Sequence, residues 1–362
     1  MILFEELIKC NNKADENWYE RCRKSIDSIA MPIGGLGKFE HLLCKIAAIE
    51  KKADISINKK ALLVFCADNG VVAQNVTQSD SEVTGRIATS ISEGTSSAAI
   101  MAKSVGMDVY TIDIGMKEAV ASTIDMHIKR GSEDITLGPA MSREDAIAAM
   151  IVGAEYMEKM ANEGVDIIAT GEAGIGNTTT SAAIASVLLG MDSDKMVGRG
   201  AGISDEGYEN KKKAVKRAIE VNGLIHYAQN DTLDAIDVLA RVGGYDIAAM
   251  AGVYLAAPLY NVPIVMDGVI SATAALVAAN INENITGFII ESHKSSELAM
   301  NKICEPLFLN PVIDAKMHIG EGTGAVIMLG MLDIIMNVYN DAARFNDIGV
   351  EQYEDYDNTG RR

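Results

Sequence analysis

The chain has 362 residues, of which 48% are hydrophobic and 23% are charged, and its formal net charge is −18. This length is enough for one large α/β domain with a smaller appendage, and the hydrophobic share excludes an intrinsically disordered chain. The negative charge argues against nucleic acid or an anionic membrane as a partner. A phosphorylated ligand would therefore have to be held by backbone amides and a few placed cations.

The five cysteines are odd in number and include no Cys-x-x-Cys pair. This pattern argues against a disulfide framework or a metal site, and it favours reduced thiols in the cytoplasm. The first ten residues mix charged side chains into an apolar run, so they do not resemble a signal peptide. The most apolar stretch, Ile247–Met266, contains Pro258 and Pro263, and we expect a buried helix and a strand there rather than a membrane span.

Short apolar runs alternate with helical patterns along the chain. From the N-terminus we expect helices over most of 1–30 and up to about 51, a strand over Ala61–Ala67, a helix over 83–104, a strand over Asp108–Ile114 and an irregular section up to 139. We then expect a helix over 143–162, a strand over Val165–Ala169, and helices over Thr178–Leu189, around Lys211–Lys213 and over Asp246–Ala257. The last expected elements are strands over Val262–Met266 and Gly287–Glu291 and a helix ending near 345, before a solvated acidic tail. This alternation predicts a mainly parallel sheet flanked by helices.

Polar side chains follow the expected strands. The strand ends carry Asp68-Asn69, Asp113 to Gly115, Glu172, Asp267-Gly268 and Ser292-His293. Ligands of parallel sheets bind at the carboxyl ends of the strands. We therefore expect these side chains to share one rim, which is the predicted site, although a structural role for His293 is the simpler interpretation.

The stretch Gly164–Thr180 contains the strongest local signal. An apolar strand is followed by a glycine-rich turn and then by a helix whose first residues include Asn177 and Thr178. Free N–H groups at a helix N-terminus and the helix dipole favour an anion. An ordinary βα turn would look similar, but Glu172 within the turn would repel a phosphate unless it faced another part of the ligand. The pattern thus indicates a site with two ends.

Two further loops are candidates for chemistry. Val197–Ile203 is a second glycine-rich loop, and Lys211 on the helix after it could pair with a phosphate. Glu321 stands within Gly320–Gly324, where burial would raise its pKa toward that of a useful base. Alternatively, Glu321 complements the dipole of the last helix. The chain lacks G-x-x-x-x-G-K-[ST], G-x-S-x-G and a G-x-G-x-x-G after the first strand, which disfavours kinases, hydrolases and dehydrogenases.

Together these motifs resemble the nicotinate-nucleotide:dimethylbenzimidazole phosphoribosyltransferase family, whose members activate the lower-ligand base of cobamides. The matching blocks are Pro32–Glu40, Gly171–Thr179, Val197–Gly202, Gly243–Gly252 and Gly320–Ala325. The resemblance implies an α/β domain over 59–324 and a small helical domain built from both chain ends, 1–58 and 325–362. It also implies a homodimer and transfer of phosphoribose from nicotinate mononucleotide to an aromatic acceptor, with inversion, release of nicotinate and no metal or cofactor.

The resemblance also assigns roles to residues of this sequence. Glu321 would be the general base. The phosphoribosyl and nicotinate groups would be held by Glu172, Gly174, Ile175, Gly176, Asn177, Thr178, Gly200, Gly202, Lys211, Asp267 and Ser292. The acceptor would be contacted by Thr77, Ser79 and Ser81.

The acceptor loop departs from the family pattern. The family's loop reads close to Val-Ser-Ala-Tyr-Pro-Gln-Glu-Val-Thr. In Val76–Thr84 of this chain, Ser79 stands in place of the aromatic tyrosine, Asp80 in place of the proline and Ser81 in place of the glutamine. After the first strand, Asn69 stands where the family has histidine. Losing an aromatic face removes stacking area and enlarges the pocket. We therefore expect an acceptor other than dimethylbenzimidazole, such as a phenol, p-cresol or a purine.

Two-subunit relatives that activate phenols are known in this family, so a heterodimer with a paralogue is an alternative to a homodimer. The competing function is a non-catalytic or weakly active subunit that stabilises an active paralogue. The retained Glu321 and the two glycine loops favour the active enzyme.

Overall fold

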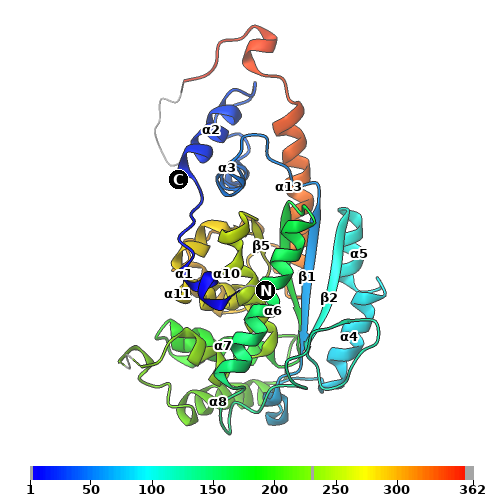
Figure 1. The fold of residues 1–362 in the computed structure, drawn as a ribbon, viewed down its shortest axis with the longest axis vertical. Helices are drawn as coiled ribbons and strands as arrows, with labels where there is room; N and C mark the ends of the chain where they lie inside the picture. The colour runs from blue at the N-terminus through cyan, green and yellow to red at the C-terminus, as the bar shows by residue number, and fades with distance from the viewer. Residues whose placement is uncertain (1–2, 230–231, 355–362) are drawn as a thin grey trace.

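A computed structural model describes residues 3–229 and 232–354 of the chain. Its centre is a six-stranded sheet in the order β3-β2-β1-β4-β5-β6, and every strand pair is parallel. The strands are β1 (Lys60–Ala67), β2 (Met107–Gly115), β3 (Ile124–Asp125), β4 (Ile167–Ala173), β5 (Ile264–Met266) and β6 (Ile289–Glu291). The expected parallel sheet is thus confirmed (Figure 1).

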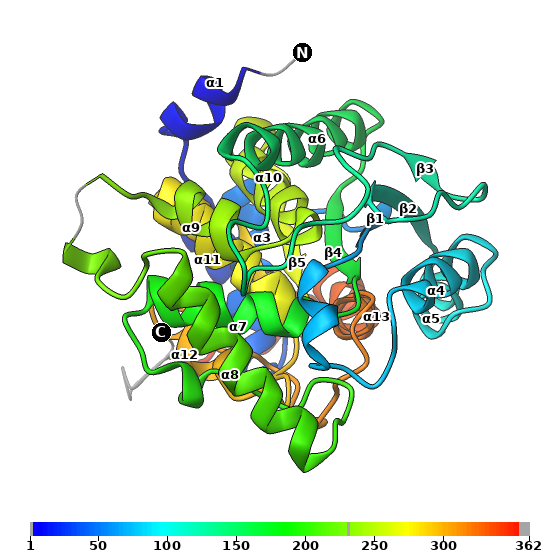
Figure 2. The same ribbon diagram turned by 90° about the horizontal axis from the view of Figure 1, so that it is seen from below.

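Helices cover both faces of the sheet (Figure 2). The helices are α1 (Phe4–Lys9), α2 (Glu16–Asp27), α3 (Lys38–Glu50), α4 (Glu82–Ser92), α5 (Ser97–Ser104), α6 (Arg143–Asn162), α7 (Asn177–Leu188), α8 (Asp205–Val221), α9 (Ala235–Val242), α10 (Tyr245–Tyr260), α11 (Val269–Ile281), α12 (Ala299–Cys304) and α13 (Thr323–Asp341). On one face α10 packs on β1, β2 and β4, with α6 outside it, while α4, α5 and α13 cover the other face.

The central helix α10 is buried all round because it lies between the sheet and α6. Its side chains are buried from Tyr245 to Pro258. A side chain at Gly252 would collide with the Met150 carbonyl of α6, and one at Gly153 would collide with the Ala249 carbonyl of α10. Glycine at these two positions therefore lets the two helix backbones touch. This close packing makes α6 and α10 the rigid support behind β1 and β4.

Helices from the N-terminal and C-terminal parts of the chain meet in a small helical part, whereas α1 packs on α10. Helices α2 and α3 pack together, α3 contacts α13, and Ile29 forms an isolated bridge with Arg344 (Figure 1). The Arg344 guanidinium also donates to the Ser25 carbonyl oxygen at 2.7 Å. The domain boundaries at 58/59 and 324/325 stay a prediction. Within the described ranges α13 is the helix long and apolar enough to cross a membrane, and 50% of its apolar window is buried inside the protein, as in a core helix.

Several elements differ from the sequence-based expectation. Strand β4 ends at Ala173 rather than Ala169, so Gly171 and Glu172 belong to the strand and not to the turn, and the sequence did not predict α9 or α12. The single helix expected over 83–104 is two helices, because Gly94 adopts a φ of +76° and Ser96 starts a new helix by accepting the N–H of Ala99. The section expected to be irregular contains the short edge strand β3. The last helix ends at Asp341 rather than near 345. Most of the predicted solvated tail, from 355 onward, lies outside the described residues.

Candidate active site

A cavity of about 220 Å³ lies at the carboxyl ends of the strands, beside α7 and α8. It brings together most of the residues expected there. Those that line it are Thr77, Ser79, Glu172, Gly174, Ile175, Gly176, Asn177, Thr178, Gly200, Lys211, Asp267 and Glu321. Segments separated by more than two hundred residues thus meet at one edge of the sheet, as expected for a parallel α/β fold.

The turn between β4 and α7 forms one wall of this cavity. A side chain on Gly174 would lie 2.6 Å from the Asp246 carboxylate and 2.9 Å from the Ala67 carbonyl oxygen, so only glycine fits. Gly176 adopts a φ of +96° and turns the chain into α7, which begins at Asn177. The N-terminus of α7 therefore faces the cavity, where its free N–H groups can bind an anion.

Asn177 links two buried carboxyl groups beneath the turn. Its side-chain amide donates to Glu172 at 2.5 Å and to Asp246 at 2.9 Å. Burial raises the pKa of Asp246 to about 6 and the pKa of Glu172 well above its usual value, and neighbouring carboxylates add to both shifts. Burial therefore favours the neutral form of Glu172. A neutral carboxyl group repels a phosphate less than a carboxylate does, so this shift is compatible with an anion site.

The proposed phosphate end of the cavity contains a buried lysine. Lys211 is 1% exposed, and its Nζ donates to Thr178 Oγ1 at 2.7 Å. Burial lowers the pKa of Lys211 to about 8, while the Glu297 carboxylate acts in the opposite direction. The neighbouring Lys212 pairs with Glu209, and Lys213 is exposed. Of these three lysines, Lys211 alone reaches the cavity.

Glu321 also lines the cavity and lies in a strained turn. Its φ is +58°, between Gly320 at +83° and Gly322 at +86°. A side chain on Gly171 would lie 2.7 Å from the Glu321 carbonyl oxygen, so β4 packs directly against this turn. Non-glycine residues rarely adopt such a φ, and a strained residue at the wall of a cavity is typical of functional sites.

Asp267 fastens the Glu321 turn and the start of α13. Its carboxylate accepts the N–H groups of Gly322, Gly324 and Ala325 at 3.2, 2.8 and 3.2 Å. These are amides that Glu321 would bind if it complemented the dipole of α13. Asp267 therefore fulfils that structural role, and the Glu321 carboxylate is not required for it.

The environment of the Glu321 carboxyl group favours a base. Burial raises its pKa, partly offset by Ser96 and Ala98 at the start of α5, and Asp267 raises it further. Its Oε2 atom is buried and has no hydrogen-bond partner among the described residues. A buried carboxylate oxygen with an unfilled acceptor can take a proton from a bound ligand.

Three of the expected binding residues do not line the cavity. Ser292 Oγ is buried and donates to the Met266 carbonyl oxygen, and Ser81 Oγ accepts the Lys117 ammonium at 3.2 Å. Gly202 is also outside the lining, and its N–H donates to the Arg199 carbonyl oxygen at 3.1 Å. The roles assigned to Ser81, Gly202 and Ser292 stay predictions.

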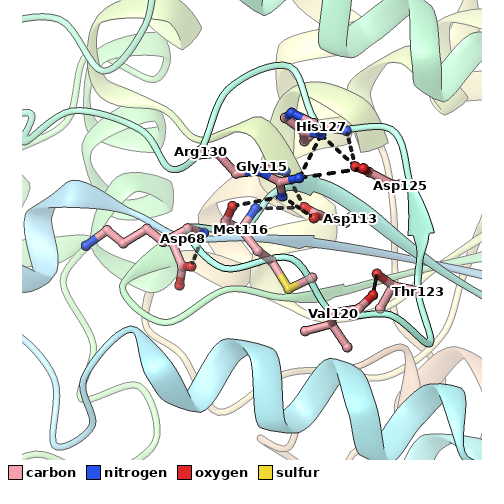
Figure 3. A network of polar contacts seen from close by, with 10 residues as sticks. Asp68, Asp113, Gly115, Met116, Val120, Thr123, Asp125, His127 and Arg130 are labelled. Atoms are coloured by element: carbon pink, nitrogen blue, oxygen red, sulfur yellow. Dashed lines mark hydrogen bonds and ion pairs between the residues drawn. The ribbon is translucent and has the colours of Figure 1, made fainter.

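The expected rim is shorter than the sequence suggested, because Asp113 and Asp68 serve a neighbouring loop. Asp113 accepts the N–H groups of Gly115 and Met116 and forms an ion pair with Arg130 at 2.6 Å (Figure 3). Asp68 accepts the N–H of Lys117 at 2.7 Å. These carboxylates order the chain after β2, and neither lines the cavity.

Sequence reasoning missed two acidic residues of the site. Asp246 lies in the Gly243–Gly252 block, where its position two residues after Gly244 at the helix start was an available signal. Glu297 follows two serines in a segment that reads as an ordinary polar loop, yet its carboxylate reaches the second glycine loop. Such a contact depends on tertiary structure, and the sequence held no signal for it. His293, set aside as structural, also lines the cavity.

Known proteins resemble this chain over nearly its whole length. Residues 12–350 match a family model described as phosphoribosyltransferase. The chain is 38% identical to nicotinate-nucleotide–dimethylbenzimidazole phosphoribosyltransferase of Acetivibrio thermocellus, over 92% of this chain and 93% of that protein. It is also 38% identical to the enzyme of that name from Clostridium tetani, over 98% and 97%.

A solved structure shares the fold. CobT from Thermus thermophilus superposes with a TM-score of 0.85 at 29% sequence identity, covering 93% of this chain and all of that one. Both the full-length family match and the relatives' identity exceed what a shared fold alone would produce. The chain belongs to the nicotinate-nucleotide–dimethylbenzimidazole phosphoribosyltransferase family.

Proposed function

We propose that this protein transfers the phosphoribosyl group of nicotinate mononucleotide to an aromatic lower-ligand base in cobamide synthesis, and that it is a pentosyltransferase. The observation that carries the proposal is one cavity lined both by Lys211, which donates to Thr178, and by Glu321, whose Oε2 atom has no hydrogen-bond partner among the described residues. The names of the full-length relatives support the same donor and reaction class.

The reaction follows from this arrangement. The donor phosphate binds at the Lys211 cation and the start of α7, which orients C1′ of the ribose. An acceptor nitrogen or hydroxyl oxygen attacks C1′ from the face opposite nicotinate, so the configuration inverts from β to α. The C1′–N bond to nicotinate breaks with its electron pair left on the ring nitrogen, and Glu321 takes the proton lost by the acceptor.

The choice of acceptor is a further part of the proposal. The relatives' names support dimethylbenzimidazole, while Ser79 in the cavity wall replaces the aromatic side chain expected of the family. A smaller side chain leaves more room and less stacking area. We infer that the protein also accepts adenine, phenol or p-cresol, and that it works in the cytoplasm as a dimer with a second copy or a paralogue.

The test is nicotinate release from nicotinate mononucleotide by the purified chain alone. Dimethylbenzimidazole, adenine, phenol and p-cresol are supplied in turn, and the α-riboside phosphate product is identified by mass. Turnover that depends on an acceptor supports the reaction, and the ranking of acceptors tests the effect of Ser79. Silence with all four acceptors would overturn the proposal in favour of a non-catalytic partner subunit.

A further inference from the structure

Glu297, just before α12, reaches into the second glycine loop at the phosphate end of the cavity. Its Oε1 accepts the Gly200 N–H at 2.8 Å. A side chain on Gly198 would collide with the Glu297 carboxylate, so the missing Cβ at Gly198 makes the space for it. The carboxylate is thus held in a cradle that this loop provides, and it lines the cavity itself.

The same carboxylate lies near the buried lysine. A side chain on Gly200 would lie 3.4 Å from Lys211 Nζ and 3.1 Å from Thr178 Oγ1, which places these groups around one point. Lys211 has no carboxylate within ion-pair distance among the described residues, and Glu297 is the charge that stabilises its protonated form. The other charged or titratable side chains lining the cavity are Glu172, Arg199, Asp267, His293, His318 and Glu321.

An acidic side chain beside a phosphate site is unfavourable unless it performs another task. Two anions separated by a few ångströms repel by about 1 kcal/mol even in water, and more when partly buried. A carboxylate at this position must therefore make stabilising interactions that outweigh the repulsion. The contacts of Glu297 indicate two such benefits, because Glu297 fixes the backbone of the loop and compensates the charge of Lys211.

We propose that Glu297 is a positioning residue for the donor phosphate, which fastens the 198–202 loop through Gly200 and keeps Lys211 a cation. The inference rests on the proposed function in taking the donor's phosphate as the ligand of this loop. Glu297 itself need not touch the phosphate. Its effect is on the affinity for the donor and not on the chemical step.

Two substitutions separate the two benefits. E297Q keeps an oxygen that can accept the Gly200 N–H but removes the charge, whereas E297A removes both. G198A leaves Glu297 in the chain and fills its cradle. Binding of nicotinate mononucleotide is measured by calorimetry between about pH 7 and pH 9.5, where its phosphate monoester is already mostly a dianion because the second pKa is about 6. Inorganic phosphate loses its second proton nearer neutral pH, so its binding is compared only from about pH 8 upward.

The expected results differ among the variants. E297A and G198A should weaken donor binding about tenfold or more at every pH, because a charge-assisted hydrogen bond is lost. E297Q should bind nearly as well as wild type at pH 7, but its affinity should decline at lower pH than that of wild type, since Lys211 gives up its proton earlier. In turnover, E297A should raise KM for the donor with little change in kcat.

Other results would overturn the inference. E297A binding within threefold of wild type would show that the loop does not need Glu297, and tighter binding by E297Q would mean that the carboxylate competes with phosphate. Failure of the proposed function would look different. In that case wild type would release no nicotinate with any acceptor, while inorganic phosphate binding could still depend on Glu297.

Discussion

The Asp267 carboxylate accepts the Gly324 N–H at 2.8 Å and thereby ties the end of β5 to the first turn of α13. The turn that carries Glu321 lies immediately before this contact, and its Gly322 N–H binds the same carboxylate. The proposed base is consequently held by a neighbouring strand end rather than by its own helix. The geometry of the base should depend on Asp267.

Substituting D267A should loosen this turn. We expect the free energy of unfolding to fall by about 1–3 kcal/mol, because buried amides lose their acceptor. A shift of the base by about 1 Å costs on the order of 10² in rate, so kcat should fall far more than the donor affinity. Thermal unfolding and steady-state kinetics measure both effects. D267N keeps one acceptor oxygen, so its stability and its kcat should lie between those of wild type and those of D267A. A D267A enzyme with wild-type kcat would contradict this role.

Substituting E321Q removes the proposed base without changing its size. Turnover should fall by about 10²–10⁴, the usual contribution of general base catalysis, while calorimetry should show unchanged binding of nicotinate mononucleotide. The pKa of Glu321 is raised by burial, so the acid limb of kcat in wild type should lie above the ordinary range of a glutamate. E305Q, at an exposed glutamate, is the control. Unchanged turnover in E321Q would remove Glu321 from the mechanism.

Lys211 should lower stability while supporting binding. The pKa of Lys211 is about 8 in the folded protein, compared with 10.5 for an ordinary lysine, which represents the unfolded chain. Between these two pH values the unfolded chain binds more protons than the folded protein does, so stability rises with pH. Below about pH 8 the buried charge costs up to about 3 kcal/mol, a figure that follows from the pKa difference at 1.36 kcal/mol per unit. K211M should therefore raise the melting temperature at pH 7 and abolish donor binding. The exposed K213M should change neither, and a K211M protein that still binds donor would disprove the assignment.

The acceptor loop offers a test of specificity. S79Y should restore an aromatic face in the cavity wall and increase kcat/KM for dimethylbenzimidazole relative to phenol, by a factor of about 3–10 if one stacking contact is gained. Competition between the two acceptors in one reaction measures this ratio directly. S104Y is the matched control, because Ser104 is exposed at the end of α5 and lies outside the cavity. An equal change in both variants would show that Ser79 does not select the acceptor.

The sequence allowed the sheet and most of the cavity to be predicted, because long apolar runs such as those of β1 and β4 leave little ambiguity. It could not reveal β3, since Ile124–Asp125 is too short and exposed to leave a pattern. Ser292 was expected to face the ligand because it follows a strand, but its hydroxyl is used by the Met266 carbonyl oxygen. The role of Glu297 depends on a contact 97 residues away along the chain, which no local signal encodes.

The position of the Glu321 turn has a consequence for synthesis of the protein. The turn packs against Gly171 in β4 and is fastened by Asp267 after β5, so it follows both of its supports in the chain. The proposed base can therefore take its place only after the ribosome has delivered β4, β5 and the segment that follows them. The loops that surround Lys211 are made more than a hundred residues earlier, but Glu297, which fastens the 198–202 loop, is made only shortly before Glu321. The phosphate site and the proposed base are therefore both completed by the segment that follows β6.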